Sequence, residues 1–113
     1  MSGISTHVLD LTRGGPAAGV VVRLEREDGG RWRELSRGET DTDGRIKSLL
    51  PQQEPLRSGR FRLGFETASY FRAQGSGCFH PYVEIAFEVV DPTQNYHVPL
   101  LVTPHSYSTY RGS

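Results

Sequence analysis

This sequence has little cysteine and lysine, and it has no net charge. Cys78 is its only cysteine, so neither an intrachain disulfide nor a cysteine metal cluster can form, and we expect Cys78 to be a small, half-buried side chain. Thirteen acidic and thirteen basic side chains cancel, and Lys47 is the only lysine. A chain without net charge has no field that attracts nucleic acid or an anionic membrane, so we expect neither as a partner.

Long apolar runs are also missing. No stretch approaches the ~20 consecutive apolar residues that a membrane-spanning helix needs. No cationic and apolar leader precedes Ile4. We therefore expect a soluble, cytoplasmic protein. With 113 residues, it is expected to form a single domain over residues 1–113 with one modest core.

Glycine and proline are frequent, and the apolar residues fall in short alternating runs. This pattern is typical of many short strands joined by tight turns. The clearest strand alternates over residues 82–90, and Asp-Gly-Gly at residues 28–30 predicts a hairpin. Eight strands are predicted, at residues 4–11, 20–27, 32–37, 45–49, 60–66, 82–90, 96–103 and 106–110. One helix is predicted at residues 67–74, with Thr67 as its cap. Eight regularly spaced strands indicate an all-β sandwich.

Two histidines lie within predicted strands. His7 is in the middle of the first strand and His97 is near the start of the seventh. A neutral imidazole can take a proton from water and return it to a leaving nitrogen. The residues alone leave two interpretations open, because a histidine in a strand can also be a core residue hydrogen-bonded to the backbone. Nothing in the sequence shows that the two side chains converge.

Arg45 follows Asp-Thr-Asp-Gly at residues 41–44. This tetrapeptide is similar to the start of a calcium loop, but the twelfth position holds Gln52 instead of the chelating glutamate. We interpret it as a turn in which Gly44 adopts a positive φ. The turn places Arg45 at the start of a strand, where its guanidinium can stabilise an anion or a developing oxyanion. A solvated surface arginine is the alternative.

The last residues of the chain are rich in groups that can bind a ligand. Ser108 and Tyr110 offer hydroxyls, and the tyrosine ring can also stack on a flat ligand; pairing across a sheet is the alternative. Arg111, Gly112 and Ser113 follow directly. Gly112 allows the backbone to turn closely. We expect this end of the chain to be docked.

Three stretches together resemble one family. They are Ile-Ser-Thr-His-Val-Leu-Asp at residues 4–10, Thr-Asp-Gly-Arg at residues 42–45, and Tyr-Ser-Thr-Tyr-Arg-Gly-Ser at residues 107–113. The chain resembles the 5-hydroxyisourate hydrolases, the transthyretin-like enzymes of urate breakdown. The resemblance implies a transthyretin-like sandwich of two four-stranded sheets with a short helix after the fifth strand. It also implies a homotetramer with active sites in a channel between dimers. His105 departs from the family, because an apolar aromatic residue is expected there.

The resemblance also implies a role for each candidate residue. His7 and His97 match the catalytic histidines that position and deprotonate water, although which of them is the base stays open. Arg45 and Tyr110 would hold the substrate, with Ser108 as a further contact. The edge of the pocket would be formed by Arg111, Gly112 and Ser113.

A further hypothesis concerns Ser113. Its α-carboxylate is expected to reach His7, and a carboxylate bonded to one imidazole nitrogen fixes the tautomer of the ring and stabilises its cation. The resemblance implies no cofactor and no metal. Three histidines, His7, His97 and His105, are enough in number to bind zinc, but their spacing matches no zinc motif.

The predicted activity is hydrolysis of 5-hydroxyisourate, at a cyclic amide bond, to 2-oxo-4-hydroxy-4-carboxy-5-ureidoimidazoline in purine catabolism. A non-catalytic carrier of the transthyretin type, binding a small aromatic ligand, is the alternative. A carrier has no need of His7, Arg45, His97 and the Tyr-Arg-Gly-Ser end together. A β-sandwich interaction module is a third possibility, in which these residues would be unrelated.

Overall fold

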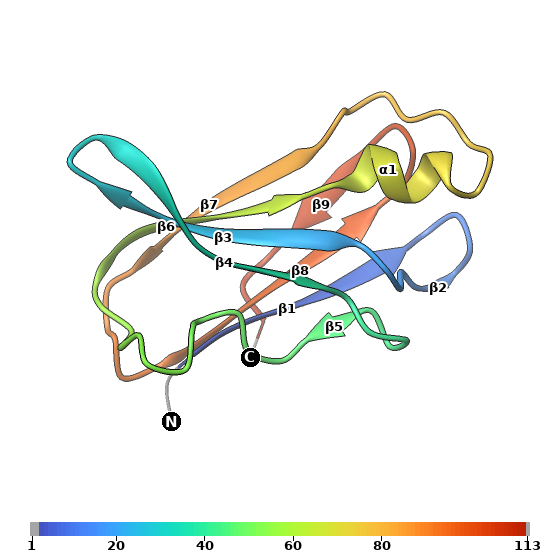
Figure 1. Ribbon diagram of the computed structural model, residues 1–113. Coiled ribbons are helices and arrows are strands. Elements are labelled where there is room, and N and C mark those ends of the chain that lie inside the picture. The colour runs from blue at the N-terminus through green and yellow to red at the C-terminus, as the bar shows by residue number, and fades with distance from the viewer. Residues whose placement is uncertain (1–2, 113) are drawn as a thin grey trace.

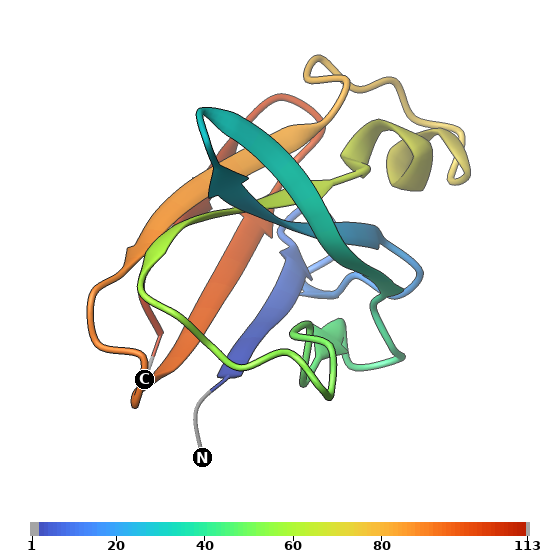
Figure 2. The same cartoon turned by 60° about the vertical axis from the view of Figure 1, so that its left-hand side comes forward.

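The computed structural model describes residues 3–112 as two β-sheets packed face to face, with one short helix at one end (Figures 1 and 2). In chain order the elements are β1 (Gly3–Asp10), β2 (Gly15–Pro16), β3 (Val21–Asp28), β4 (Arg31–Glu39), β5 (Arg45–Ile46), β6 (Gly59–Phe65), α1 (Thr67–Arg72), β7 (Val83–Val89), β8 (Asn95–Val102) and β9 (Tyr107–Thr109). The all-β sandwich with one short helix is as the sequence predicts.

One sheet has the strand order β2-β1-β8-β9, with β5 also pairing with β1. Strands β1 and β8 run parallel over their whole length, from Gly3 opposite Asn95 to Asp10 opposite Val102. Because β8 occupies one edge of β1, β2 and β5 share the other edge at different points along it. Strand β9 pairs antiparallel with the far edge of β8.

The other sheet has the order β4-β3-β6-β7, with every pair antiparallel. Strands β3 and β4 form the predicted hairpin, and both turn glycines have positive φ, 60° at Gly29 and 79° at Gly30. A two-residue turn of this kind matches the right-handed twist of the strands. The inner faces of both sheets bury the core, which is made of alternating aliphatic and aromatic side chains that include Val8, Leu63 and Leu100.

The sequence missed one strand and overestimated another. Residues 15 and 16, Gly-Pro, look like part of a turn, yet they pair with Asp10 and Leu9 of β1 as strand β2. The sheet therefore has five strands where four were expected. Strand β5 ends at Ile46 although residues 45–49 were predicted. Leu49 lies beyond it, and its N–H bonds to the carbonyl of Ile4 outside the regular ladder.

The prediction of Thr67 as the helix cap is wrong. The helix α1 starts at Thr67 itself, and the residue that precedes it, Glu66, has no side-chain capping bond. The Thr67 side chain is turned into the protein, and its hydroxyl is buried without a hydrogen-bond partner. Burial of Ala68, Tyr70 and Phe71 against the sheets, rather than capping, stabilises this short helix.

A buried carboxylate ties α1 to β1. Asp10 is fully buried and accepts hydrogen bonds from the Tyr70 hydroxyl at 2.9 Å and from the backbone N–H groups of Thr12 at 3.0 Å and Arg13 at 3.3 Å. Burial alone raises the pKa of Asp10, but the hydrogen bonds outweigh it and lower the pKa below the ordinary value. Hydrogen bonds to the Asp10 carboxylate therefore connect the helix with the turn after β1.

Candidate active site

The candidate residues gather on the outer face of the five-stranded sheet. In β1 the buried residues Ile4, Thr6 and Val8 face the core, so Ser5 and His7 between them face outward. The same alternation in β8 places His97 and Leu101 outward. His7 and His97 are therefore half-buried residues of an outer surface, and the interpretation as core histidines is wrong.

The strand register arranges these side chains in rows, because residues directly opposite each other share a face. His7 is paired with Arg45 of β5 on one side and with Pro99 of β8 on the other. Ser5 is paired with His97, which is bridged in turn to Gly112.

The turn before β5 positions Arg45 through two local features. Gly44 has the predicted positive φ, 74°. A side chain on Gly44 would overlap the carbonyl oxygen of Val8, so the turn can pack against β1 only with glycine there. The carboxylate of Asp41 accepts the N–H groups of Asp43 and Arg45 at 2.9 Å each. The hydrogen bond from the N–H of Arg45 is the largest cause that lowers the pKa of Asp41 below its ordinary value.

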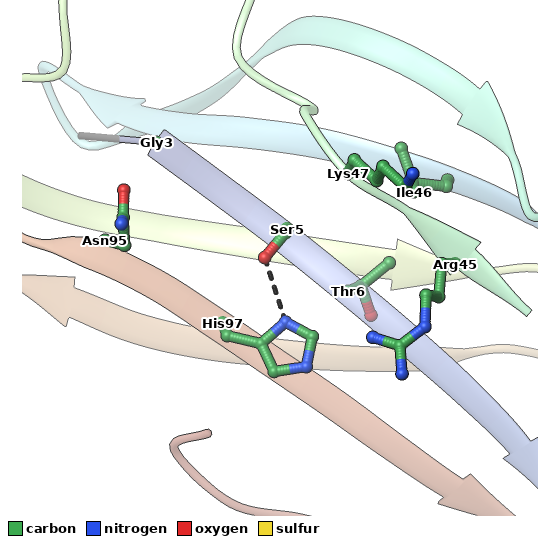
Figure 3. A pocket seen from close by; sticks show the side chains of 8 residues that line it. All are labelled: Gly3, Ser5, Thr6, Arg45, Ile46, Lys47, Asn95 and His97. Atoms are coloured by element: carbon green, nitrogen blue, oxygen red, sulfur yellow. Dashed lines mark hydrogen bonds between the residues drawn. The ribbon is translucent and has the colours of Figure 1, made fainter. Parts of the chain in front are cut away.

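The imidazole of His97 is held on two sides. Its Nδ1 lies 2.9 Å from the hydroxyl oxygen of Ser5. The backbone of Gly112 passes the opposite side of the ring, where its N–H donates to the His97 carbonyl at 2.8 Å. Figure 3 shows that the ring edge carrying Nε2 points toward the guanidinium of Arg45.

Burial, the charge of Arg45 and the neighbouring His7 lower the pKa of His97, which favours its neutral form. Desolvation is the largest cause that lowers its pKa below the ordinary value of 6.5, followed by the charge of Arg45 and then by His7. The neutral imidazole can accept a proton, and the guanidinium of Arg45, an exposed residue that lines the same cavity, carries a positive charge. The two groups supply a base and an electrostatic clamp for developing negative charge.

A cavity of about 360 Å³ opens at these residues. That volume is within the range of small-molecule sites, about 300–1,000 Å³. His97 and Arg45 line the cavity, whereas His7 is held next to Arg45 in the strand pairing. The remaining lining residues are Gly3, Ser5, Thr6, Ile46, Lys47 and Asn95 (Figure 3).

The C-terminal residues divide between the two faces of the sheet. Ser108 stands opposite Leu101 and Gly112 opposite His97, and this unshifted register places Tyr110 opposite Pro99 on the outer face. Neither Ser108 nor Tyr110 lines the cavity, and Tyr110 is 58% exposed.

Arg111 turns away from the outer face. Its guanidinium lies over the ring of Tyr96, 4.5 Å from the centroid, and donates to Gln94 Oε1 at 2.9 Å. These contacts anchor the end of the chain to the start of β8. Ser113, with its predicted carboxylate contact to His7, lies outside the described residues.

Six residues that line the cavity were not among the predicted site residues: Gly3, Ser5, Thr6, Ile46, Lys47 and Asn95. The signal for Ser5 was its position two residues before His7, on the same face of a strand. His105 is exposed in the turn between β8 and β9, where its backbone N–H bonds to Thr103 Oγ1.

Within residues 3–112, no three or more His, Cys, Asp or Glu side chains are grouped to hold a metal ion. In the same residues, no helix is long and apolar enough to cross a membrane.

The fold and the site define a class, a two-sheet transthyretin-like sandwich with histidine and arginine on the outer face of one sheet. The profile of the HIUase/Transthyretin family matches residues 4–112, and the chain belongs to this family. It is 46% identical to the 5-hydroxyisourate hydrolase of Caulobacter vibrioides over the full length of both chains. It is also 44% identical to the uric acid degradation bifunctional protein TTL of Arabidopsis thaliana, of which it covers 37%, with 97% of this chain aligned.

Solved structures of both branches of the family share the fold. The 5-hydroxyisourate hydrolase of Klebsiella pneumoniae superposes with a TM-score of 0.86 at 37% identity, covering 100% of this chain and 94% of that one. Transthyretin from Sparus aurata superposes with a TM-score of 0.91 at 30% identity, covering 99% and 97%. The shape of the backbone therefore does not separate a 5-hydroxyisourate hydrolase from a transthyretin. The residues of the outer face must do so.

Proposed function

We infer that this chain is a hydrolase that opens 5-hydroxyisourate at a cyclic amide bond, giving 2-oxo-4-hydroxy-4-carboxy-5-ureidoimidazoline. The predicted hydrolase function, rather than that of a carrier, is confirmed by full-length relatives named 5-hydroxyisourate hydrolase and by the Klebsiella structure. The observation that carries the inference in this molecule is that His97, whose pKa is lowered, and Arg45 line one cavity.

The first step of the proposed reaction uses His97 and Arg45. Nε2 of His97 takes a proton from water as the water oxygen attacks the amide carbonyl carbon. The negative charge that develops on the carbonyl oxygen is stabilised by the guanidinium of Arg45. The lowered pKa of His97 keeps the ring unprotonated and ready for this step at neutral pH.

The second step breaks the carbon–nitrogen bond. The tetrahedral intermediate collapses, and the leaving nitrogen receives a proton from the imidazolium of His97, which restores the neutral ring. The carbonyl carbon becomes a carboxylic acid group of the opened ring, and this group loses its proton to solvent. One water molecule is consumed and no cofactor takes part. Arg45 is placed to hold the carboxylate that results.

The other outer-face residues are proposed to bind and orient the substrate. His7 lies next to Arg45 and is positioned to contact the ring of the substrate or its attacking water. Ser108, Tyr110 and Gly112 follow on the same face. We also propose that Arg111 acts through the anchoring of this segment, and that the Ser113 carboxylate completes the site at His7.

The site is proposed to be completed in a homotetramer of a cytoplasmic enzyme. In one subunit the outer face is open, with Tyr110 largely exposed. Strands β7 and β9 form sheet edges, where unpaired backbone groups can pair with a second copy of the chain. A tetramer has four times the 12.6 kDa mass of the chain, which light scattering coupled to size exclusion measures directly.

A stopped-flow assay tests the proposed activity. Urate is oxidised by urate oxidase in the cuvette, and ultraviolet absorbance follows the decay of 5-hydroxyisourate with and without the protein. We expect faster decay in proportion to protein concentration. His97→Asn and His7→Asn should each lower kcat/KM by about two to four decades, the range for losing an acid–base group.

His105→Asn is the matched control, because His105 is exposed in the turn between β8 and β9 and does not line the cavity. It should keep the activity of the wild-type protein. Decay at the spontaneous rate at every concentration of the wild-type protein would contradict the proposed function. Full activity in His97→Asn would assign the base to another group.

A further inference from the structure

We propose that Ser5 is a positioning residue for His97: its hydroxyl oxygen accepts a hydrogen bond from Nδ1–H and thereby keeps the lone pair on Nε2, which faces the cavity. The catalytic consequence of this contact rests on the proposed function. The proposed hydrogen bond requires one particular tautomer of His97, and the tautomer can be measured without any substrate.

The parallel pairing of β1 with β8 creates the contact. Ser5 and His97 are direct register partners, although they are 92 residues apart in the sequence. Both side chains point to the outer face, and both line the cavity. The oxygen of Ser5 lies 2.9 Å from Nδ1, which is a good hydrogen-bond distance (Figure 3).

The other side of the imidazole leaves little room for a different orientation. The backbone of Gly112 passes so close to Cδ2 that a methyl group there would overlap the ring. Flipping the ring would exchange Nδ1 with Cδ2 and give up the bond to Ser5. Ser5 and Gly112 therefore select one orientation, in which Nε2 points toward Arg45.

The direction of the hydrogen bond follows from the proton cycle. His97 is neutral before it takes a proton on Nε2 and cationic afterwards, and Nδ1 carries a hydrogen in the cation. If Nδ1–H donates to Ser5 in the neutral ring as well, the bond persists through both states. If Ser5 donated to Nδ1, its hydroxyl would have to rotate each time the ring was protonated, and Nε2 would carry the hydrogen in the neutral form.

A serine also has the right charge for this position. A carboxylate at Nδ1 would orient the ring but would favour the imidazolium and raise the pKa of the histidine. The serine hydroxyl is neutral, so it orients His97 without opposing the effect of burial and of Arg45. Orientation and a low basicity are thus supplied by different residues.

Nitrogen NMR of the ring tests the tautomer directly. The protein is labelled with ¹⁵N-histidine and measured at a pH at which His97 is neutral, and His97→Asn assigns its signals by their loss. We expect the wild-type protein to show hydrogen on Nδ1 and a bare Nε2. Ser5→Ala should show a mixture of tautomers, and Ser5→Thr, which keeps the hydroxyl, should restore the wild-type pattern.

Kinetics provide the second measurement. Ser5→Ala should lower kcat by about tenfold to a hundredfold with little change in KM, by analogy with the partners that orient metal-binding histidines. Ser5→Thr should recover most of the loss. Ser76→Ala is the matched control, because it removes the hydroxyl of a partly exposed serine, which bonds to the carbonyl of Gly77, and should leave kcat unchanged.

Two results would overturn the proposal. One is a wild-type His97 with its hydrogen on Nε2. The other is a Ser5→Ala protein whose tautomer and kcat both match those of the wild-type protein. If the wild-type protein shows no hydrolase activity, the proposed function fails, but the tautomer measurement still decides the Ser5–His97 contact. If Ser5→Ala does not fold, the wild-type spectrum and Ser5→Thr decide it.

Discussion

Gly112 donates its backbone N–H to the carbonyl of His97 at 2.8 Å, and the absence of a side chain on Gly112 leaves the space that the imidazole occupies. One residue thus extends the β8–β9 pairing to the end of the described chain and shapes the candidate site. The glycine is required here by close approach rather than by an unusual backbone angle, since Gly112 is not among the glycines with positive φ.

The first prediction is that Gly112→Ala displaces the His97 ring. The added methyl group would overlap Cδ2 of His97. The overlap is relieved only if the ring moves away from Ser5 or if the end of the chain moves outward. We expect kcat/KM to fall by about tenfold or more, since small displacements of catalytic groups have large effects. Thermal unfolding should change little because the site is at the surface. Normal activity in this variant would show that the chain end moves freely.

The second prediction concerns the pKa of His97. Arg45 is the second-largest cause that lowers it, so Arg45→Gln should raise the pKa toward the ordinary value of 6.5. The sign follows from repulsion, since removing a positive neighbour makes the imidazolium less costly. A proton NMR titration of the His97 ring measures the change. Arg37→Gln is the control, because Arg37 is paired with Glu34 on β4 in the other sheet, and it should leave the pKa of His97 unchanged.

The third prediction separates the charge of Arg45 from its shape. Arg45→Lys keeps the positive charge, so the pKa of His97 should stay low in the same titration. The planar fork that presents two parallel donors to a carbonyl or carboxylate is lost, however. We expect most of the hydrolase activity to disappear while the fold stays intact. Full activity would mean that only the charge matters.

The sequence predicted the sandwich and the turn before Arg45 because both depend on local patterns. Strand alternation repeats every two residues, and the positive φ of Gly44 follows from the turn residues around it. Strand β2 was missed because Gly-Pro is typical of a turn, and only its pairing with β1 makes it a strand. The cap prediction for Thr67 failed because tertiary burial, rather than capping, places that side chain.

The candidate site was predictable only in part, because its geometry depends on pairing between distant strands. The motifs named His7, Arg45 and His97, but the register that groups them joins β1 to β5 and to β8. Ser5 carries no chemical signature, and its contact with His97 spans 92 residues. Such contacts follow from the order of strands in the sheet, which short-range patterns do not encode.

The last prediction concerns the buried carboxylate that holds the helix. Tyr70→Phe removes the hydroxyl that donates to Asp10 at 2.9 Å and leaves an ionised, fully buried group with one donor fewer. The free energy of unfolding should fall by about 1.5–3 kcal/mol at pH 7, the range for hydrogen bonds to charged groups. Folding lowers the pKa of Asp10, so ionised Asp10 contributes to the free energy of unfolding above the unfolded pKa of about 3.9. This contribution is lost as pH falls through the folded pKa. The difference between wild type and Tyr70→Phe should therefore shrink as pH falls below about 3.9. Denaturant unfolding at a fixed protein concentration measures both, with Tyr82→Phe at a half-exposed position as the control. A difference that stays constant from pH 7 into the acid range would show that the tyrosine acts through packing and not through the Asp10 charge.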